Sequence, residues 1–106
     1  MIPIYDFRKV ELKTALVLEV EEIAGADRIW KLTVDLGGER RQIVAGIKKF
    51  YSKEALVGKN VVVVSNLAPA IIRGVESQGM LLAAKNGDEL SLLSPDKAAA
   101  PGSLVG

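Results

Sequence analysis

The amino-acid sequence predicts an all-β fold with short helices, formed by one domain over residues 1–106. Residues 61–64 are four consecutive valines, apolar on both alternating faces, which is typical of a strand covered on both sides. Residues 29–36 alternate apolar and polar side chains instead, with Trp30, Leu32, Val34 and Leu36 sharing one face. Aromatic residues make up only 5% of the chain, so we expect an aliphatic core built mainly from strands, with Trp30 as an anchor.

The composition limits the possible functions. The chain contains no cysteine and no histidine, so it lacks a disulfide framework, a thiolate zinc site, a thiol nucleophile and the commonest general base. We therefore expect no catalytic site, no cofactor and no metal. No stretch approaches the roughly 20 apolar residues that span a bilayer, and the N-terminus lacks the apolar run of a signal peptide. A cytoplasmic protein without membrane contact is expected.

The first part of the chain predicts a helical turn and a strand. Residues 6–11 favour one helical turn with Asp6 as its N-cap. The strand predicted over residues 12–20 places its even-numbered apolar residues on one face, namely Leu12, Leu16, Leu18 and Val20. Gly37-Gly38 is a hairpin signal between the strand at 29–36 and a returning strand at 41–45. These three strands predict an antiparallel meander.

A short helix is predicted next, over residues 47–56, with Ser52 capping its last turn and Gly58 ending it. Phe50 is expected to plug the bottom of the barrel. The neighbouring Lys48, Lys49 and Tyr51 leave two alternatives open, since mixed basic and aromatic side chains can bind RNA or can simply be a solvated surface.

The second half predicts two more strands, over residues 60–66 and 78–84, which flank a polar connector. Asn86-Gly87 predicts a hairpin turn before a short strand at 90–93, and Ser94 favours one more helical turn. The apolar C-terminus is expected to dock on the domain. A meander of three strands, a helix and two further strands is the order of an OB-fold, a five-stranded Greek-key barrel, here over about residues 12–93 with an extension at 94–106.

The charge distribution predicts an anionic partner. The net charge is only +1. Residues 40–73, however, hold seven basic side chains against Glu54 alone: Arg40, Arg41, Lys48, Lys49, Lys53, Lys59 and Arg73. The alternative is a solvated, lysine-rich surface around a helix.

One extended motif carries a family resemblance. Asn66-Leu67-Ala68-Pro69 and the run from Arg73 to Ala84, RGVESQGMLLAA, closely resemble the signature of the EMAP-type tRNA-binding domain. Shorter matches elsewhere are Ala26-Asp27-Arg28, Val34-Asp35-Leu36-Gly37, Ile43-Val44-Ala45-Gly46 and Leu56-Val57-Gly58-Lys59. Within the family, the sequence is most similar to the C-terminal domain, or free beta subunit, of methionyl-tRNA synthetase and to the stand-alone structure-specific tRNA-binding protein.

The resemblance implies a non-catalytic OB-fold module that binds tRNA by shape and backbone and delivers it to an aminoacyl-tRNA synthetase. It also implies a homodimer joined through Ile2–Phe7 and the tail through Val105, with a catalytic synthetase chain as a possible further partner. The residues we predict to bind tRNA are Arg28, Lys31, Thr33, Arg41, Lys48, Asn66, Arg73, Ser77 and Gln78.

The predicted residues differ in how strongly their chemistry indicates RNA. Arg73 beside Gly74 is the strongest phosphate candidate, because a guanidinium binds phosphate through two hydrogen bonds and glycine permits close backbone approach. Ser77 and Gln78 offer neutral hydrogen bonds. Asn66 either contacts RNA or caps the following turn, and Met80 is expected in the core.

Two other functions remain alternatives. One is a chaperone of the same fold that binds unfolded polypeptide. The other is an assembly subunit that tethers synthetases.

Overall fold

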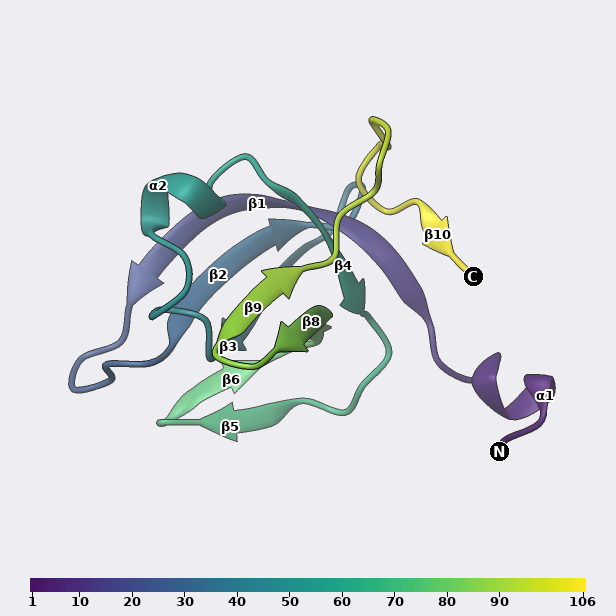
Figure 1. Ribbon diagram of the computed structural model, residues 1–106, viewed down its shortest axis with the longest axis horizontal. Helices are drawn as coiled ribbons and strands as arrows, with labels where there is room; N and C mark the ends of the chain where they lie inside the picture. The colour runs from purple at the N-terminus through teal and green to yellow at the C-terminus, as the bar shows by residue number, and fades with distance from the viewer.

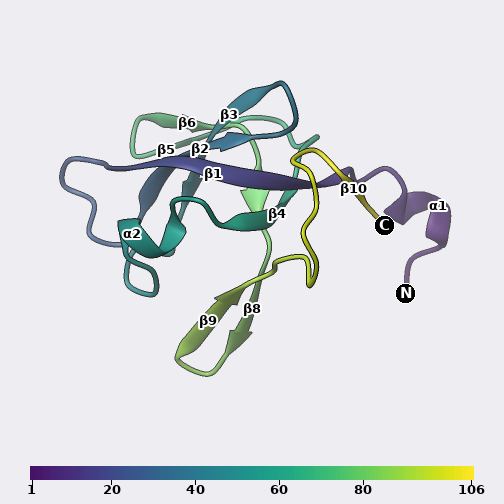
Figure 2. The ribbon, with the colours of Figure 1, turned by 90° about the horizontal axis from the view of Figure 1, so that it is seen from above.

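The computed structural model describes residues 1–106 as a nearly closed, five-stranded antiparallel barrel with small helices, which confirms the OB-type fold (Figures 1 and 2). The main sheet has the order β3-β2-β1-β4-β7, and β10 also pairs with β1. The elements in chain order are α1 (Ile4–Phe7), β1 (Leu12–Glu22), β2 (Trp30–Asp35), β3 (Arg40–Ala45), α2 (Lys53–Leu56), β4 (Asn60–Val64), β5 (Ala70–Ile72), β6 (Val75–Ser77), β7 (Met80–Leu81), β8 (Ala83–Asn86), β9 (Glu89–Leu92) and β10 (Leu104–Val105). Neither helix is long enough to cross a membrane.

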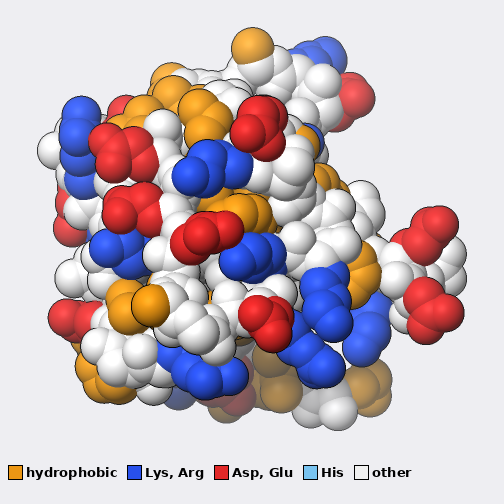
Figure 3. Space-filling model, turned by 90° about the vertical axis from the view of Figure 1, so that its left-hand side faces the viewer, with side chains coloured by type: hydrophobic (Ala, Val, Ile, Leu, Met, Phe, Trp, Pro, Cys, Tyr) orange, Lys and Arg blue, Asp and Glu red, His pale blue; other side chains and the backbone are white.

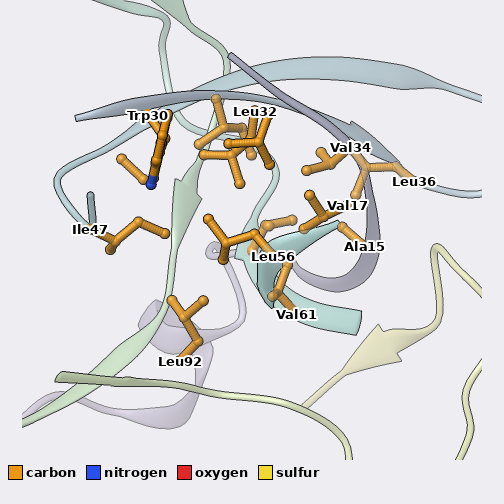
Figure 4. Packing of buried hydrophobic residues seen from close by; sticks show 14 residues of the cluster. Ala15, Val17, Trp30, Leu32, Val34, Leu36, Ile47, Leu56, Val61 and Leu92 are labelled. Atoms are coloured by element: carbon orange, nitrogen blue, oxygen red, sulfur yellow. The ribbon is translucent and has the colours of Figure 1, made fainter. Parts of the chain in front are cut away.

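The core confirms the alternation predicted for β2. Trp30, Leu32, Val34 and Leu36 are all buried and point into the barrel (Figure 4). The Trp30 ring is fixed in place because its Nε1 donates to the Tyr51 carbonyl oxygen over 2.8 Å. All four valines of residues 61–64 are buried, as expected for a strand covered on both faces.

The inward face of β1 differs from the prediction. Ala15, Val17 and Val20 are buried, whereas Leu12, Leu16 and Leu18 are only half-buried. The pairing of β1 with β2 shifts between Val17 and Glu19, which is a β-bulge. A bulge adds one residue to one strand and exchanges its two faces, so a single parity cannot describe the whole strand.

The connection between β3 and β4 also corrects the sequence prediction. Ser52 is extended, and its Oγ accepts from Ala55 N over 3.2 Å, so it caps a helix that starts only at Lys53. Residues before Ser52 form a separate turn, in which Phe50 N donates to Ile47 O. Phe50 is 44% exposed, and Leu56 fills the barrel in its place. The prediction that Phe50 plugs the barrel was wrong. The prediction that Met80 lies in the core was also wrong, because Met80 is 48% exposed.

Several element boundaries also differ. The predicted connector after β4 contains the hairpin β5–β6, and the strand predicted over 78–84 divides into β7 and β8. The turn between β8 and β9 is formed by Gly87 and Asp88, one position beyond the predicted pair. Helix α1 begins at Ile4, after Pro3, so Asp6 lies within it and is not its cap. Residues 94–97 form no helical turn.

The C-terminal extension docks on the barrel, as predicted, mainly through Thr14. Thr14 N donates to Ser103 O, and its Oγ1 donates to Ala100 O over 2.9 Å while accepting from Ser103 N. Gly102 then packs against the β2–β3 hairpin so closely that a Cβ there would lie 2.2 Å from Leu36 O. Gly102 also has a φ of +84°, so both its space and its backbone conformation require glycine.

We predict that Gly102→Ala destabilises the protein more than Gly38→Ala does. Gly38 has a comparable φ of +95° but open space around the position of a Cβ. Gly38→Ala should therefore cost only the left-handed backbone strain, about 1–2 kcal/mol. Gly102→Ala adds a backbone clash that the extension can relieve only by moving away. Urea unfolding of both variants measures the difference, and equal losses would contradict the close packing of Gly102.

Candidate nucleic-acid interface

The barrel is closed by hydrogen bonds between β3 and residues 76–79, which we call the seam. Gln78 N donates to Gln42 O over 2.8 Å, and Gln42 N donates to Gln78 Oε1 over 3.1 Å. Ser77 is buried, and its Oγ accepts from Val44 N over 3.0 Å and donates to Gly79 O. The side chains of Ser77 and Gln78, both predicted to bind tRNA, are thus used within the seam.

Asn66 holds the N-terminal segment against the barrel. Its Oδ1 accepts from Glu11 N over 2.8 Å, and its Nδ2 donates to Lys9 O over 2.6 Å. The amide therefore does not cap the following turn, which was one of the two interpretations of Asn66. Both of its polar ends are occupied within the chain.

Glu11 takes part in the same junction. Ser65 Oγ donates to Glu11 Oε1 over 2.6 Å, and the Lys13 ammonium lies 3.5 Å from the same oxygen. The hydrogen bond from Ser65, followed by the charge of Lys13, lowers the pKa of Glu11 from its ordinary value of 4.5.

Arg41 is turned toward the seam. Its Nη1 donates to Ser65 O and reaches Gln78 O over 3.5 Å, while Nη2 lies 3.3 Å from Glu39 Oε1. The guanidinium therefore has both protein acceptors and a carboxylate partner. Its remaining exposed edge lines a hollow with Arg40 and Pro69.

Arg73 sits at the tip of the β5–β6 hairpin. Arg73 and Gly74 form its two-residue turn, with φ values of 53° and 77°. Two consecutive positive φ values are characteristic of a type I′ turn, a conformation that a non-glycine residue adopts only at a cost in strain. The side chain is exposed and takes part in no ion pair or hydrogen bond within the protein.

The β1–β2 loop brings Arg28 to the same place. Residues 26–29 and Ile72-Arg73 line one hollow, so two arginines distant in sequence face it together. Arg28 also lines a second hollow, with Gly46, Lys49 and Phe50 of the β3–α2 connection. We call these three segments, residues 23–29, 46–52 and 73–74, the loop end; it lies on the left of the molecule in Figure 1.

The remaining basic candidates are already paired with carboxylates. Lys48 Nζ lies 3.5 Å from Glu22 Oε1 and 4.8 Å from the centre of the Trp30 ring. Lys31 Nζ lies 3.7 Å from Glu21 Oε2, its neighbour across the β1–β2 ladder. Thr33 stands on the same strand, between Glu19 of β1 and Gln42 of β3.

The basic block of residues 40–73 is therefore not one patch. Its members divide among the seam, the loop end and the region around α2, where Lys59 lies 5.7 Å from the centre of the Tyr51 ring. Figure 3 looks directly at the loop-end side of the molecule, where Lys and Arg side chains are interspersed with carboxylates above and gather at the lower right. Lys49, an exposed member of the basic block, was left open between RNA binding and a solvated surface and was not among the predicted site residues.

The sequence matches a known family. The family model described as "Putative tRNA binding domain" matches residues 12–104. The chain is 55% identical to a methionine–tRNA ligase of Thermotoga maritima over 104 residues, and 56% identical to that of Methanoregula boonei over 105 residues. These alignments cover 98% and 99% of this chain but only 16% of each ligase.

Solved structures show the same fold over the whole chain. A MetRS-related protein from Pyrococcus horikoshii superposes with a TM-score of 0.94 at 36% identity, covering 100% of this chain and 98% of that one. The CsaA chaperone protein from Picrophilus torridus gives a TM-score of 0.92 at 29% identity, with 100% of both chains covered. The CsaA chaperone from Bacillus anthracis gives 0.90 at 27%, covering 100% and 99%.

We predict that Ser65→Ala raises the pKa of Glu11 toward 4.5, because it removes the hydrogen bond that contributes most to the shift. The lowered pKa means that the ionised carboxylate stabilises the folded state above pH 4.5, and that this contribution disappears as the pH falls through the lowered value. NMR titration of the Glu11 side-chain carboxyl measures the shift. Lys13→Met should raise the pKa as well, because it removes the charge and the hydrogen bond of Lys13. An unchanged Glu11 midpoint in Ser65→Ala would refute the assignment.

Proposed function

The chain belongs to this tRNA-binding domain family, and on that premise we propose that it is a non-catalytic module that binds tRNA through its loop end. Recognition uses the shape and phosphate backbone of tRNA, with little sequence preference. The observation that carries the proposal is the convergence of Arg28, Lys49 and Arg73 from three separate segments, none of them paired with a carboxylate. We place this activity in the cytoplasm.

Unpaired cations are the side chains best able to bind phosphate. An exposed ion pair must be broken before its lysine or arginine can contact RNA, whereas Arg28, Lys49 and Arg73 need give up no protein partner. Each phosphate contact also releases condensed counterions, which makes binding strongly dependent on salt. Arg41, Lys31 and Lys48 have protein partners, so we assign them a secondary role around this centre.

Within a larger assembly, we propose that the module delivers tRNA to an aminoacyl-tRNA synthetase of the methionyl type. Support comes from the ligases that contain a segment about half identical to this chain. The chain spans 16% of the length of those ligases, so the catalytic activity of the relatives is assigned here to a partner chain or domain.

A homodimer is proposed from an apolar groove between the two chain ends. Its lining includes Ile4, Phe7, Val10, Leu104 and Val105, all of them exposed. A twofold dimer would cover the same groove on both copies. We predict that Leu104→Glu shifts the protein from dimer to monomer, with Leu93→Glu, an exposed leucine outside the groove, as the control. Light scattering coupled to gel filtration measures the mass, and a dimer that survives Leu104→Glu would contradict this interface.

The alternative is a chaperone of the same fold that binds unfolded polypeptide in an apolar groove presented by its dimer. The similarity to the two CsaA structures favours keeping it as a second candidate. Binding of an apolar polypeptide should depend little on salt, whereas tRNA binding should weaken steeply with salt. Separate titrations with tRNA and with a denatured polypeptide, each at two salt concentrations, distinguish the two functions.

We predict that Arg73→Asn weakens tRNA binding without destabilising the fold. Asparagine is favoured before glycine in a type I′ turn and tolerates a positive φ, so the variant should be at least as stable as the wild type. Loss of one phosphate contact should lower the slope of log affinity against log salt by about one unit for every tRNA. Mobility shifts at several salt concentrations measure the slope, and thermal unfolding measures the stability.

Lys97→Ala is the matched control, because it removes one positive charge from the C-terminal extension instead of the loop end. Equal effects of Lys97→Ala and Arg73→Asn would indicate a diffuse charge effect in place of a site. If the wild-type protein shifts no tRNA even at low salt, the proposed function is wrong.

A further inference from the structure

We propose that the hollow formed by Arg28, Gly46, Lys49 and Phe50 binds an unpaired nucleobase of the RNA, which stacks on the Phe50 ring. The inference rests on the proposed function and specifies which part of the RNA this hollow binds. The hollow would take an unpaired nucleotide from a loop, a bulge or an end, while the cations of the loop end contact phosphates.

The placement of Phe50 is the first observation. Phe50 is 44% exposed and does not belong to the core cluster. The next residue, Tyr51, points the opposite way: its hydroxyl oxygen accepts from Leu92 N over 3.0 Å, and its carbonyl oxygen accepts from Trp30 Nε1 over 2.8 Å. These two hydrogen bonds hold Tyr51 in place, and the neighbouring Phe50 side chain is directed toward solvent.

The turn that carries Phe50 is also rigidly held. Phe50 N and Tyr51 N both donate to Ile47 O over 3.0 Å, and Lys48 N donates to Arg28 O over 3.2 Å. The last bond ties the β3–α2 connection to the β1–β2 loop. The backbone that carries the ring is therefore already ordered before a ligand binds, which favours affinity.

The surroundings of the ring suit a nucleotide. Gly46 contributes no side chain to the hollow, and even a Cβ added there would come no closer than 4.0 Å to Arg28 O. Arg28 and Lys49 line the same hollow without a carboxylate partner. An aromatic face beside two cations matches a base together with its phosphate, the pairing used by proteins that bind single-stranded nucleic acids.

Continuity with the phosphate site is the second observation. Arg28 lines both this hollow and the one that Arg73 lines, so the two are neighbours on one surface. An isolated exposed apolar side chain needs no explanation. Phe50 differs because the other exposed aromatic residues, Tyr5 and Phe7, belong to the N-terminal segment, whereas Phe50 lies at the loop end among unpaired cations.

The test compares two RNAs of equal length and charge, a hairpin with an unpaired loop and a fully paired duplex. Phe50→Ala should weaken binding of the loop-containing RNA about 5- to 100-fold. Its affinity for the duplex and its salt slope should stay unchanged, because no phosphate contact is lost. Phe50→Trp should keep wild-type affinity, and its fluorescence should be quenched by the loop-containing RNA but not by the duplex.

Val57→Ala serves as the control, since Val57 has a similar exposed fraction, 48%, and lies outside the hollow. The proposal is overturned if Phe50→Ala binds both RNAs as the wild type does, if it weakens both equally, or if Val57→Ala has the same effect. Circular dichroism of each variant distinguishes lost binding from lost folding. A wild-type protein that binds neither RNA would overturn the proposed function itself, and the subsite with it.

Discussion

Closure of the barrel at the seam is the constraint on which the rest of the molecule depends. The reciprocal bonds between Gln42 and Gln78 join β3 to the segment just before β7, and Ser77 Oγ accepts from the buried Val44 N. Buried backbone groups without partners would cost about 1–3 kcal/mol each. The seam fixes residues 76–79, which directly follow the β5–β6 hairpin. The turn of that hairpin carries Arg73, which lines one hollow with Arg28 of the β1–β2 loop.

The alternation of β2, the valine run and the glycine-rich turns were enough to predict the fold from the sequence. The site was harder to predict, because a sequence shows which side chains are polar but not which are already satisfied. Ser77, Gln78 and Asn66 looked available, yet their partners lie at Val44, Gln42 and Glu11, far away in the sequence. The prediction that Phe50 plugs the barrel failed because the sequence pattern did not show where the turn ends. Ser52 is extended and separates the turn at 47–51 from helix α2, and this break leaves no signal in the spacing of apolar residues.

Pairing also explains why a cluster of charges in the sequence did not become a patch in space. Lys48 lies near Glu22 and Arg41 near Glu39, so the carboxylates near the strands neutralise part of the basic block. Exposed pairs of this kind contribute little stability, about 0–1 kcal/mol each. These pairs neutralise Arg41 and Lys48 but not the cations of the loop end, where Arg28, Lys49 and Arg73 have no carboxylate partner. The strained turn at Arg73 fits this picture, because it holds a guanidinium at a position where glycine or asparagine would fold more easily.

The C-terminal extension docks on β1, which places the C-terminus on the same side of the molecule as the N-terminus. Both chain ends emerge on the right in Figure 1, whereas the loop end lies on the left, along a long axis of 41 Å. Any polypeptide joined at either terminus would therefore start from the side away from the proposed RNA site. The barrel would then act as a spacer between an attached protein and a bulky nucleic acid. Such an arrangement would let the same module serve as a fused segment or as a free subunit with one binding surface.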